Sequence, residues 1–283
     1  MLIPVIAVLL QSCKSEQPID RSAEYFKAIQ GDWLGEYEFE NDGKKEKQNY
    51  AFIIQDSFCG GIYTDFSHFR IHFDTLFLTR NDKNVPVKGE MIPLRILELN
   101  ATTLRTIRLY DDNAEKHDPP DTIVYTRIKK KNNIVPSKIT FSSSVCYGTC
   151  PAMTLDIDSI GNFRFLGQAF TDVEGGFNAK LSKQLYDNIV QSVRNLPINI
   201  MKAKYEAGIT DQPDYNLVIE HNGKKETFYV YGSNGEPLEL EIIFQKLMQL
   251  YTLVKLIPDK AVTGETFQNS GVYRLGPPLL QLD

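Results

Sequence analysis

The chain has 283 residues, of which 42% are hydrophobic and 24% are charged. This composition is typical of a folded globular protein long enough for two domains, and it excludes disordered and collagen-like classes. The 31 Lys and Arg residues are outnumbered by 36 Asp and Glu residues, which gives a net charge of −5. Because no broad cationic surface is available to release counterions from nucleic acid, we expect no nucleic-acid partner.

An apolar segment opens the chain at residues 2–10 and ends shortly before Cys13. It is too short to cross a bilayer as a helix and is typical of the hydrophobic region of a signal peptide. Residues 10–13, Leu-Gln-Ser-Cys, resemble the bacterial lipobox, whose cysteine receives diacylglycerol and becomes the mature N-terminus. The resemblance implies a lipoprotein signal peptide at residues 1–12, lipidation at Cys13 and a tether at residues 13–22. We therefore expect a bacterial cell-envelope protein anchored by lipid at the outer membrane.

Cysteine usage fits an oxidising compartment. If Cys13 carries lipid, three cysteines remain, and the simplest arrangement pairs Cys146 with Cys150. Cys59 is then left as a buried thiol, since free cysteine is among the most buried residue types.

The first region is predicted to be a β-barrel. A short helix at residues 22–29 is followed by about eight short strands separated by turn signals, a spacing that indicates an antiparallel barrel or sandwich over residues 23–130. The polar residues 129–133, Lys-Lys-Lys-Asn-Asn, mark the domain boundary and are interpreted as a solvated linker.

Three residues of this region resemble the signature of the lipocalins. Gly31 and Trp33 open the first strand, and Arg127 lies in the last one. In that family the tryptophan closes one end of the barrel and an arginine packs across its ring, a favourable cation–π contact. We expect all three residues to be structural.

The resemblance implies a barrel that could carry a small apolar ligand. The alternative is a barrel filled by its own side chains, as small barrels often are. Bulky aromatic residues expected to point inward favour the filled barrel; they are Phe52, Phe69, Phe73 and Phe77.

The second region, residues 134–257, is predicted to be an α+β domain of two strand–strand–helix units. Strands near residues 153–157 and 163–165 precede a helix at residues 181–196, and strands near residues 215–219 and 227–231 precede a helix at residues 240–254. Two helices that each have one apolar stripe can bury it on one face of an antiparallel sheet. The tail, residues 258–283, matches neither pattern and is left unassigned.

Most of this region resembles a family of bacterial envelope domains of unknown function. The family is recognised by a Cys-aromatic-Gly-Thr-Cys-Pro motif, here residues 146–151, and by a tyrosine followed by Thr-Asp-x-Pro, here Tyr205 and residues 210–213. The resemblance brings no established activity. Tyr205 and Asp211 form a candidate polar cluster, although Asp211 could equally stabilise a turn through backbone donors.

Two interpretations of the cysteine motif stay open. On a straight strand the Cα atoms of Cys146 and Cys150 would lie about 13 Å apart, so a disulfide needs a turn, which Gly148 permits. One interpretation is a structural disulfide that pins the loop to the sheet. The other is thiol-redox or copper chemistry, because Cys-x-x-x-Cys-Pro resembles the copper-binding segment of cytochrome-oxidase assembly chaperones. Residues 152–158 alternate as a strand, not as the helix of those chaperones, and His221 lies beside a hairpin turn where we expect solvent exposure.

No other chemistry is indicated. Motifs for a nucleophile elbow, a phosphate loop or a zinc protease are missing from the sequence, and Asp156 and Asp158 are interpreted as solvated positions. We therefore expect no enzymatic activity, no metal and no cofactor. The leading hypothesis is a non-catalytic binding or interaction module, displayed on a membrane, for an unknown envelope protein. The alternatives are a thiol-redox or copper-handling factor acting through Cys146 and Cys150, and a carrier of a small apolar ligand in the barrel.

Overall fold

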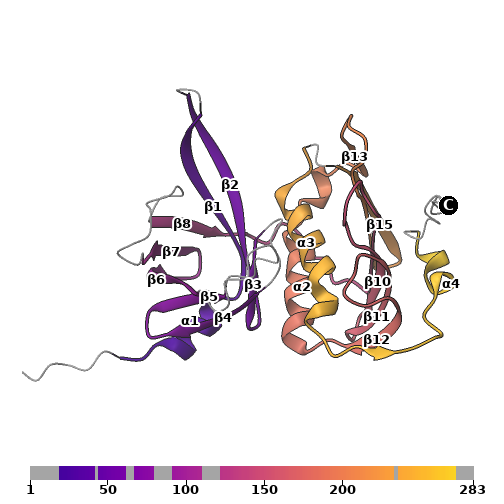
Figure 1. Ribbon diagram of the computed structural model, residues 1–283, viewed down its shortest axis with the longest axis horizontal. Helices are drawn as coiled ribbons and strands as arrows, with labels where there is room; N and C mark the ends of the chain where they lie inside the picture. The colour runs from indigo at the N-terminus through magenta and orange to yellow at the C-terminus, as the bar shows by residue number, and fades with distance from the viewer. Residues whose placement is uncertain are drawn as a thin grey trace, which may run out of the picture.

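The computed structural model describes residues 19–41, 44–61, 67–79, 91–109, 122–232 and 235–271. It contains a β-barrel and, beside it, a domain in which helices cover one face of a sheet (Figure 1). The predicted signal peptide and Cys13 lie outside the described residues. Within them, no helix is long and apolar enough to cross a membrane.

The first body is a closed barrel in which neighbouring strands are antiparallel and β1 meets β8. A short helix, α1 (Ser22–Ala28), precedes it. The antiparallel barrel predicted for this region is therefore confirmed. Its strands are β1 (Gly31–Asn41), β2 (Lys44–Gln55), β3 (Phe58–Gly60), β4 (Ser67–His72), β5 (Thr75–Thr79), β6 (Met91–Leu99), β7 (Thr103–Arg108) and β8 (Thr122–Arg127).

Side chains of the barrel itself form its core. Because strand side chains alternate between faces, Phe52 lies inside the barrel, as expected, and Phe69 does the same on β4. Phe73 and Phe77, also expected to point inward, do not. Phe73 occupies the turn between β4 and β5 with a φ of +51°, and Phe77 lies beneath Arg70. The buried core consists of Ile29, Trp33, Phe52, Ile54, Cys59, Phe69, Leu76, Leu94, Ile96, Leu104 and Tyr125.

The second body is built on a sheet with the order β13-β15-β14-β9-β10-β11-β12-β16. All its neighbouring strands are antiparallel except β13, which runs parallel to β15, so the sheet is mixed and not purely antiparallel as expected. The difference arises at one edge, where the chain leaves η1 and passes alongside β15 before it turns into β14. The strands are β9 (Lys138–Ser143), β10 (Ala152–Asp158), β11 (Asn162–Ala169), β12 (Gly175–Lys180), β13 (Lys204–Glu206), β14 (Asp214–His221), β15 (Lys224–Tyr231) and β16 (Ile257–Pro258).

Helices α2 (Lys183–Asn195) and α3 (Leu238–Gln249) cover one face of this sheet (Figure 1). The hydroxyl of Ser182 caps α2 by accepting a hydrogen bond from the backbone of Leu185 at 3.2 Å. The predicted apolar stripes of both helices are buried against the sheet, as expected for an α+β domain. Two short 3₁₀ helices follow them, η1 (Ile198–Ile200) and η2 (Leu250–Thr252).

Residues 258–271, the described part of the tail left unassigned from the sequence, extend the sheet and cover its other face; we call them the C-terminal segment. β16 pairs with β12, and α4 (Gly264–Phe267) and η3 (Gln268–Ser270) lie across the sheet from α2 and α3 (Figure 1). The ring of Phe267 is fully buried. At Gly176 a Cβ atom would lie 2.0 Å from a carbonyl oxygen of this segment, so only glycine allows the two backbones to approach so closely.

The two bodies are joined by a buried contact between the barrel wall and helices α2 and α3. Ala51 and Ile53, the outward residues of β2, pack on Ile242 of α3. Beside them the Nζ atom of Lys246 lies 2.5 Å from Oδ1 of Asp32, and both side chains are almost completely buried. Helix α3 is therefore covered on two sides, by the sheet and by the barrel.

The linker between the bodies is also fixed. The backbone amide groups of Lys131 and Asn132 donate to the carbonyl oxygen of Arg194 at 2.8 and 3.0 Å. The Asn132 side chain donates to two further carbonyl groups at the end of α2, and Lys131 pairs with Glu239 at 2.5 Å. The segment interpreted as a solvated linker is thus a clasp on α2 and α3, although its lysines are exposed.

Candidate functional site

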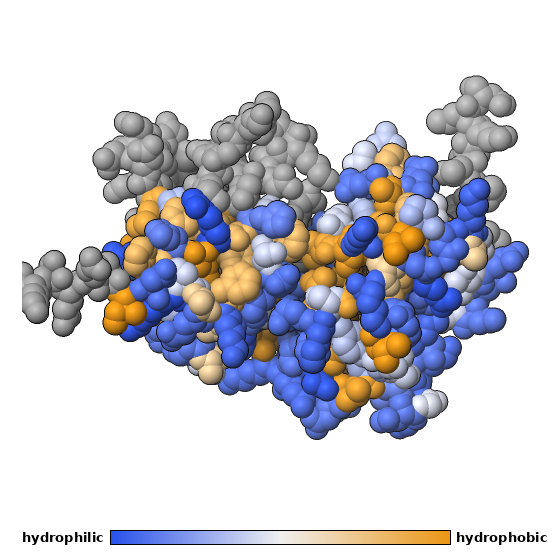
Figure 2. All heavy atoms as spheres, turned by 90° about the horizontal axis from the view of Figure 1, so that it is seen from below, coloured by the Kyte–Doolittle hydropathy of each residue, from blue (hydrophilic) through white to orange (hydrophobic). Residues whose placement is uncertain are grey.

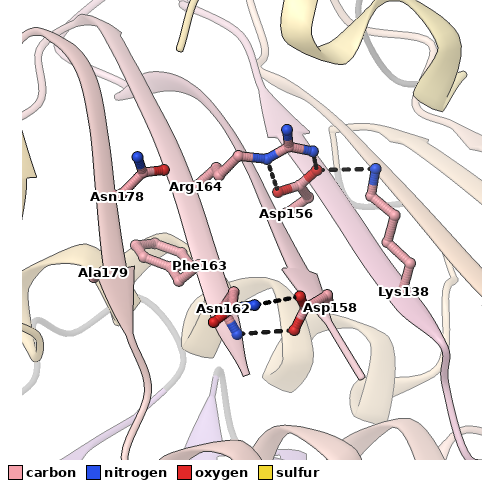
Figure 3. A pocket seen from close by; sticks show the side chains of 8 residues that line it. All are labelled: Lys138, Asp156, Asp158, Asn162, Phe163, Arg164, Asn178 and Ala179. Carbon is pink, nitrogen blue, oxygen red and sulfur yellow. Dashed lines mark hydrogen bonds and ion pairs between the residues drawn. The ribbon is translucent and has the colours of Figure 1, made fainter. Parts of the chain in front are cut away.

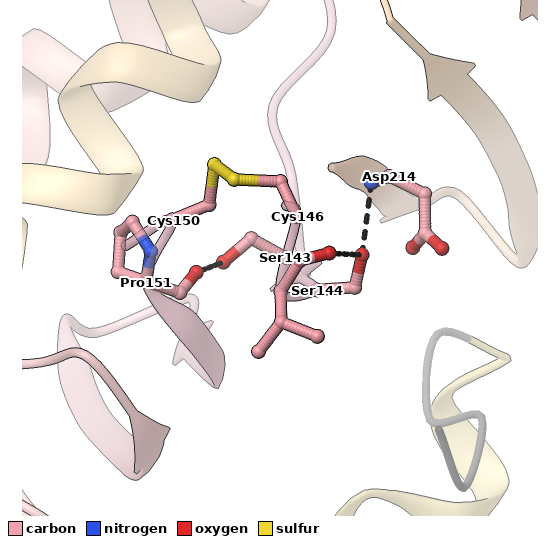
Figure 4. Close-up of a disulfide and its surroundings, with 7 residues drawn as sticks. Ser143, Ser144, Cys146, Cys150, Pro151 and Asp214 are labelled. Carbon is pink, nitrogen blue, oxygen red and sulfur yellow. Dashed lines mark hydrogen bonds between the residues drawn. A yellow bond between two sulfur atoms is a disulfide. The ribbon is translucent and has the colours of Figure 1, made fainter. Parts of the chain in front are cut away.

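The cysteine motif forms a closed loop at one end of the sheet. Cys146 and Cys150 are joined by a disulfide, with their Cα atoms 5.4 Å apart, between the end of β9 and the start of β10 (Figure 4). The chain makes the turn that this pairing requires at Gly148, whose φ is +156° and whose amide donates to the carbonyl of Cys146 at 2.8 Å. The expected Cys146–Cys150 pair is therefore present.

Hydrogen bonds hold both sides of this loop. The Ser143 hydroxyl donates to the carbonyl of Pro151 at 2.6 Å, which ties the last residue of β9 to the segment entering β10 (Figure 4). The Ser144 hydroxyl accepts a hydrogen bond from the Asp214 amide at 2.9 Å, and the Ser144 amide donates to the Asp214 carbonyl at 3.0 Å. The loop is thus fastened to three strands: β9, β10 and β14.

The Thr-Asp-x-Pro segment, residues 210–213, lies against the same loop. The amide of Tyr147 donates to the carbonyl oxygen of Asp211 at 3.1 Å. Two motifs that are separated by more than fifty residues therefore meet in space, and the second supports the backbone of the first. Tyr205 is placed differently: it is buried in the core, and its hydroxyl accepts a hydrogen bond from the Lys202 amide at 3.0 Å. The structure gives Tyr205 and Asp211 separate partners and does not bring them together as a polar cluster.

Strand register places three segments at this end of the sheet, residues 144–151, 170–174 and 206–214. Ala152 is opposite Ala169, and Tyr215 is opposite Ser143, so the segments adjoining those residues are neighbours. We call these three segments the disulfide end. In Figure 1 it lies at the end of the sheet near the label of β13.

Large hydrophobic side chains are exposed at the disulfide end. Tyr147 is 89% exposed, although its backbone is held on both sides by the disulfide and by Asp211. Val145, Phe170 and Ile209 are exposed as well. Other described residues with exposed large hydrophobic side chains, such as Ile160 and Ile200, lie elsewhere, and the face shown in Figure 2 has hydrophobic patches among hydrophilic residues. These four residues were not predicted from the sequence. The sequence did contain a signal for them, because large apolar residues in segments rich in turn-forming residues are expected to be exposed.

Two of the five described non-glycine residues with a positive φ lie at the disulfide end. Phe170 and Asp211 have φ angles of +54° and +67°, in the left-handed region that non-glycine residues seldom occupy. For a bulky residue such as phenylalanine this conformation is an outlier, and such strain persists where the surrounding structure imposes it, often at functional sites. Asn222, which also has a positive φ, lies in an ordinary Asn-Gly hairpin turn at the other end of β14.

A second candidate is a polar cavity of about 550 Å³ on the face of the sheet away from α2 and α3 (Figure 3). Its centre is Asp156, which is only 3% exposed and not solvated as expected. Its carboxylate accepts two hydrogen bonds from Arg164, at 2.9 and 2.5 Å, and pairs with Lys138 at 2.9 Å. These hydrogen bonds raise the pKa of Arg164.

The other polar side chains of the cavity also form hydrogen bonds with neighbouring protein groups. Partial burial opposes ionisation of Asp158, but hydrogen bonds from Asn162 and Ile160 outweigh it and lower the pKa of Asp158. Asn178 donates to Asp259 of the C-terminal segment. The polar side chains of this cavity bind one another, so we interpret it as an ion-pair network that holds the sheet and the C-terminal segment together.

Residues of the first and last strands of the barrel form a cap at one of its ends. The guanidinium of Arg127 lies 4.0 Å from the ring centroid of Trp33 and donates to the carbonyl oxygens of Ala28, Gln30 and Ala101. At Gly31, with a φ of +120°, a Cβ atom would lie 2.7 Å from the arginine. The geometry of Gly31, Trp33 and Arg127 is structural: it joins α1 to the first and last strands.

No metal site is found among the described residues, where no group of three or more His, Cys, Asp or Glu side chains could hold an ion. His221 is 8% exposed and lies 3.5 Å from Glu226. The expectation of solvent exposure was wrong because His221 shares a strand face with Ile219, which points into the core. It lies at the end of β14 away from Asp214, about 23 Å of strand from the disulfide end. His221 is therefore too far away to serve as a ligand beside Cys146 and Cys150.

Comparison with known proteins identifies the second body. Residues 137–251, from the start of β9 to η2, match the model of DUF6438, a domain of unknown function. No curated protein matches the chain. The matched segment contains the disulfide loop, the Thr-Asp-x-Pro segment and both helices. The expectation of a domain of unknown function is thus confirmed, and residues 137–251 form a DUF6438 domain.

Proposed function

We propose that the chain is a lipid-anchored protein of the bacterial cell envelope whose DUF6438 domain binds another envelope protein through the disulfide end. Residues 10–13 support lipidation at Cys13, and the cap formed by Trp33 and Arg127 supports a lipocalin-like barrel. Binding, not catalysis, is the proposed activity. The cysteine pair serves as a clasp for the binding loop.

One observation carries this proposal: Tyr147 is exposed while the loop that presents it is held in place. The residue is 89% exposed, yet its backbone is fixed by the Cys146–Cys150 bond and by Asp211. A backbone held in this way loses little conformational entropy on binding, and tyrosine provides a large contact area with few rotatable bonds. Tyrosines are correspondingly enriched among the residues that dominate binding energy in protein interfaces.

The barrel supports this role as a rigid base. Its interior is occupied by its own side chains, which argues against the alternative of a carrier of apolar ligands. Its outer wall is fixed to α3 through Ile242 and the Lys246–Asp32 pair. The proposed tether, residues 13–22, precedes the barrel in the sequence, so the buried contact between the two bodies would hold the DUF6438 domain at the membrane.

Site-specific photo-crosslinking in intact cells tests the proposal. The full-length protein carries p-benzoylphenylalanine in place of Thr149, an exposed residue of the disulfide loop. The matched control places the same group at Ile160, which is 67% exposed at the opposite end of the sheet. We expect a discrete protein adduct from position 149 and none of the same mass from position 160. No adduct from 149, or the same adducts from both positions, would refute the proposed binding role.

A further inference from the structure

The disulfide end has a charge pattern that its apolar residues do not explain. Its three segments contain no Lys or Arg. They contain five acidic residues, which are Asp172, Glu174, Glu206, Asp211 and Asp214. Among these, Asp172, Glu174, Glu206 and Asp211 are exposed. Lys204, which pairs with Glu206 at 2.8 Å, is the nearest cation in the sequence. Exposed apolar and acidic side chains thus share this end of the sheet, and we call the four exposed acidic residues the acidic rim.

The opposite end of the same sheet has a different balance. Lysines gather there at the ends of β9, β12 and β15 and at the start of α2; they are Lys138, Lys180, Lys183, Lys224 and Lys225. Carboxylates pair with most of these lysines, as Asp156 does with Lys138, Asp187 with Lys183 and Glu220 with Lys225. Positive and negative charges are therefore balanced at that end, whereas the disulfide end, with the exposed tyrosine, carries an excess of negative charge. Such a field attracts and orients a cationic partner and repels an anionic surface.

We propose, resting on the binding role given above, that the disulfide end takes a cationic segment of its partner protein, one rich in Arg or Lys. The ring of Tyr147 offers a face on which a guanidinium or ammonium group can stack. The aliphatic stems of the same side chains can cover Val145 and Ile209, since Arg and Lys bury their methylene groups along apolar surfaces. Carboxylates of the rim then bind the charged groups at the edge.

The same charges disfavour a lipid surface as the occupant. Membranes of bacteria and other cells present anionic headgroups, which attract basic and repel acidic protein surfaces. A protein tethered through its N-terminus would therefore hold its acidic disulfide end away from the headgroups. Tyr147 and Phe170 are aromatic residues of the kind found at membrane interfaces, but no lysine or arginine accompanies them in the three segments.

The test extends the crosslinking from position 149 in the full-length protein. The crosslinked peptide is identified by mass spectrometry, and its net charge is read from its sequence. A rim variant, Glu174→Gln with Asp211→Asn, removes two charges; asparagine tolerates the left-handed backbone of residue 211. The control variant, Glu24→Gln with Glu265→Gln, removes two exposed charges on other elements.

We expect a crosslinked segment with net positive charge. Crosslinking should fall severalfold in the rim variant and stay unchanged in the control, and Tyr147→Ala should weaken it roughly two- to fivefold, the range of an exposed cation–π contact. A neutral or acidic segment, a lipid adduct, or equal yields in the rim and control variants would overturn the cationic partner. The first and last of these outcomes would leave the binding role intact, whereas the absence of any specific adduct would refute the binding role itself.

Discussion

The buried ion pair between the barrel and the DUF6438 domain is expected to dominate the coupling of the two bodies. Lys246 Nζ lies 2.5 Å from Asp32 Oδ1 and 2.8 Å from the hydroxyl of Ser192, which in turn donates to Asp32 Oδ2 at 2.9 Å. Asn195 donates to the same carboxylate oxygen at 3.4 Å. Lys246 and Asp32 are 1% and 4% exposed. Removing one partner therefore leaves a full charge in a dry interface.

The burial of this ion pair sets the size of the expected loss in stability. Breaking a buried ion pair by removing one partner lowers the free energy of unfolding by about 3–5 kcal/mol, because the remaining charge keeps its desolvation penalty. A typical domain has only about 5–15 kcal/mol of stability, so the loss is a large fraction. Lys246→Met should thus be strongly destabilising. The double variant Asp32→Asn with Lys246→Met removes both charges and keeps an acceptor for Ser192, so it should recover most of the loss.

The assay is urea denaturation of the chain without residues 1–13, followed by two signals. Trp33, the only tryptophan in the sequence, reports on the barrel, and far-ultraviolet circular dichroism reports on both bodies. The wild-type protein should unfold in a single transition that both signals report at the same urea concentration. Lys246→Met should shift that transition to lower urea, or separate the two signals if the contact opens first. A loss below about 1 kcal/mol, with no coupling between the two substitutions, would show that the pair does not govern the interface.

Three further changes test other parts of the structure. Replacing Cys146 and Cys150 by serine should lower the free energy of unfolding by about 2 kcal/mol, measured by denaturation, because the short loop no longer restrains the unfolded chain; no loss would contradict this. Gly176→Ala should free the C-terminal segment for proteolysis, since its Cβ atom would lie 2.0 and 2.6 Å from carbonyl oxygens of that segment, whereas Gly208→Ala, with no atom within 4 Å, should not. Burial raises the pKa of Cys59 from 9.0 to about 12, so the stability that its neutral thiol provides is present below pH 9 and is lost as the pH rises towards 12, by about 1.4 kcal/mol per pH unit. Cys59→Ala should flatten that part of the stability profile, and an unchanged slope would refute the assignment.

Local sequence pattern was enough to predict much of this architecture. Alternating residues predicted the barrel and the sheet, and the 3.6-residue period predicted both helices, because each element turns one regular apolar face towards a core. The disulfide followed from compartment and spacing, and the contact between Trp33 and Arg127 from their resemblance to a known signature.

Features that depend on contacts between segments far apart in the sequence could not be predicted from local sequence pattern. Phe77 was expected inside the barrel, but the register of β5 directs Leu76 inward and places Phe77 outside. Asp156 was expected in solvent, and only pairing of β9, β10 and β11 brings Lys138 and Arg164 to it. The short helices of the C-terminal segment bury residues by packing on the sheet. They are too short to show a helical repeat of apolar residues in the sequence, so they could not be predicted.

One signal for the interface was present in the sequence and was missed. Helix α3 carries a further apolar residue, Ile242, on the side away from the stripe that faces the sheet. A helix of this kind is covered on more than one side. On that side lies Lys246, whose burial in the structure requires a partner, because lysine is almost never fully buried unless paired. Neither observation could name Asp32.

The central claim is that the Cys146–Cys150 bond is a clasp for a binding loop and not an exchange centre. Its midpoint potential tests this most directly, by equilibration of the folded chain with thiol buffers, followed by alkylation and mass measurement. We expect a midpoint below about −300 mV, as for structural disulfides of secreted proteins. A midpoint between about −120 and −200 mV, the range of disulfide-exchange proteins, would contradict it and favour a thiol-redox function.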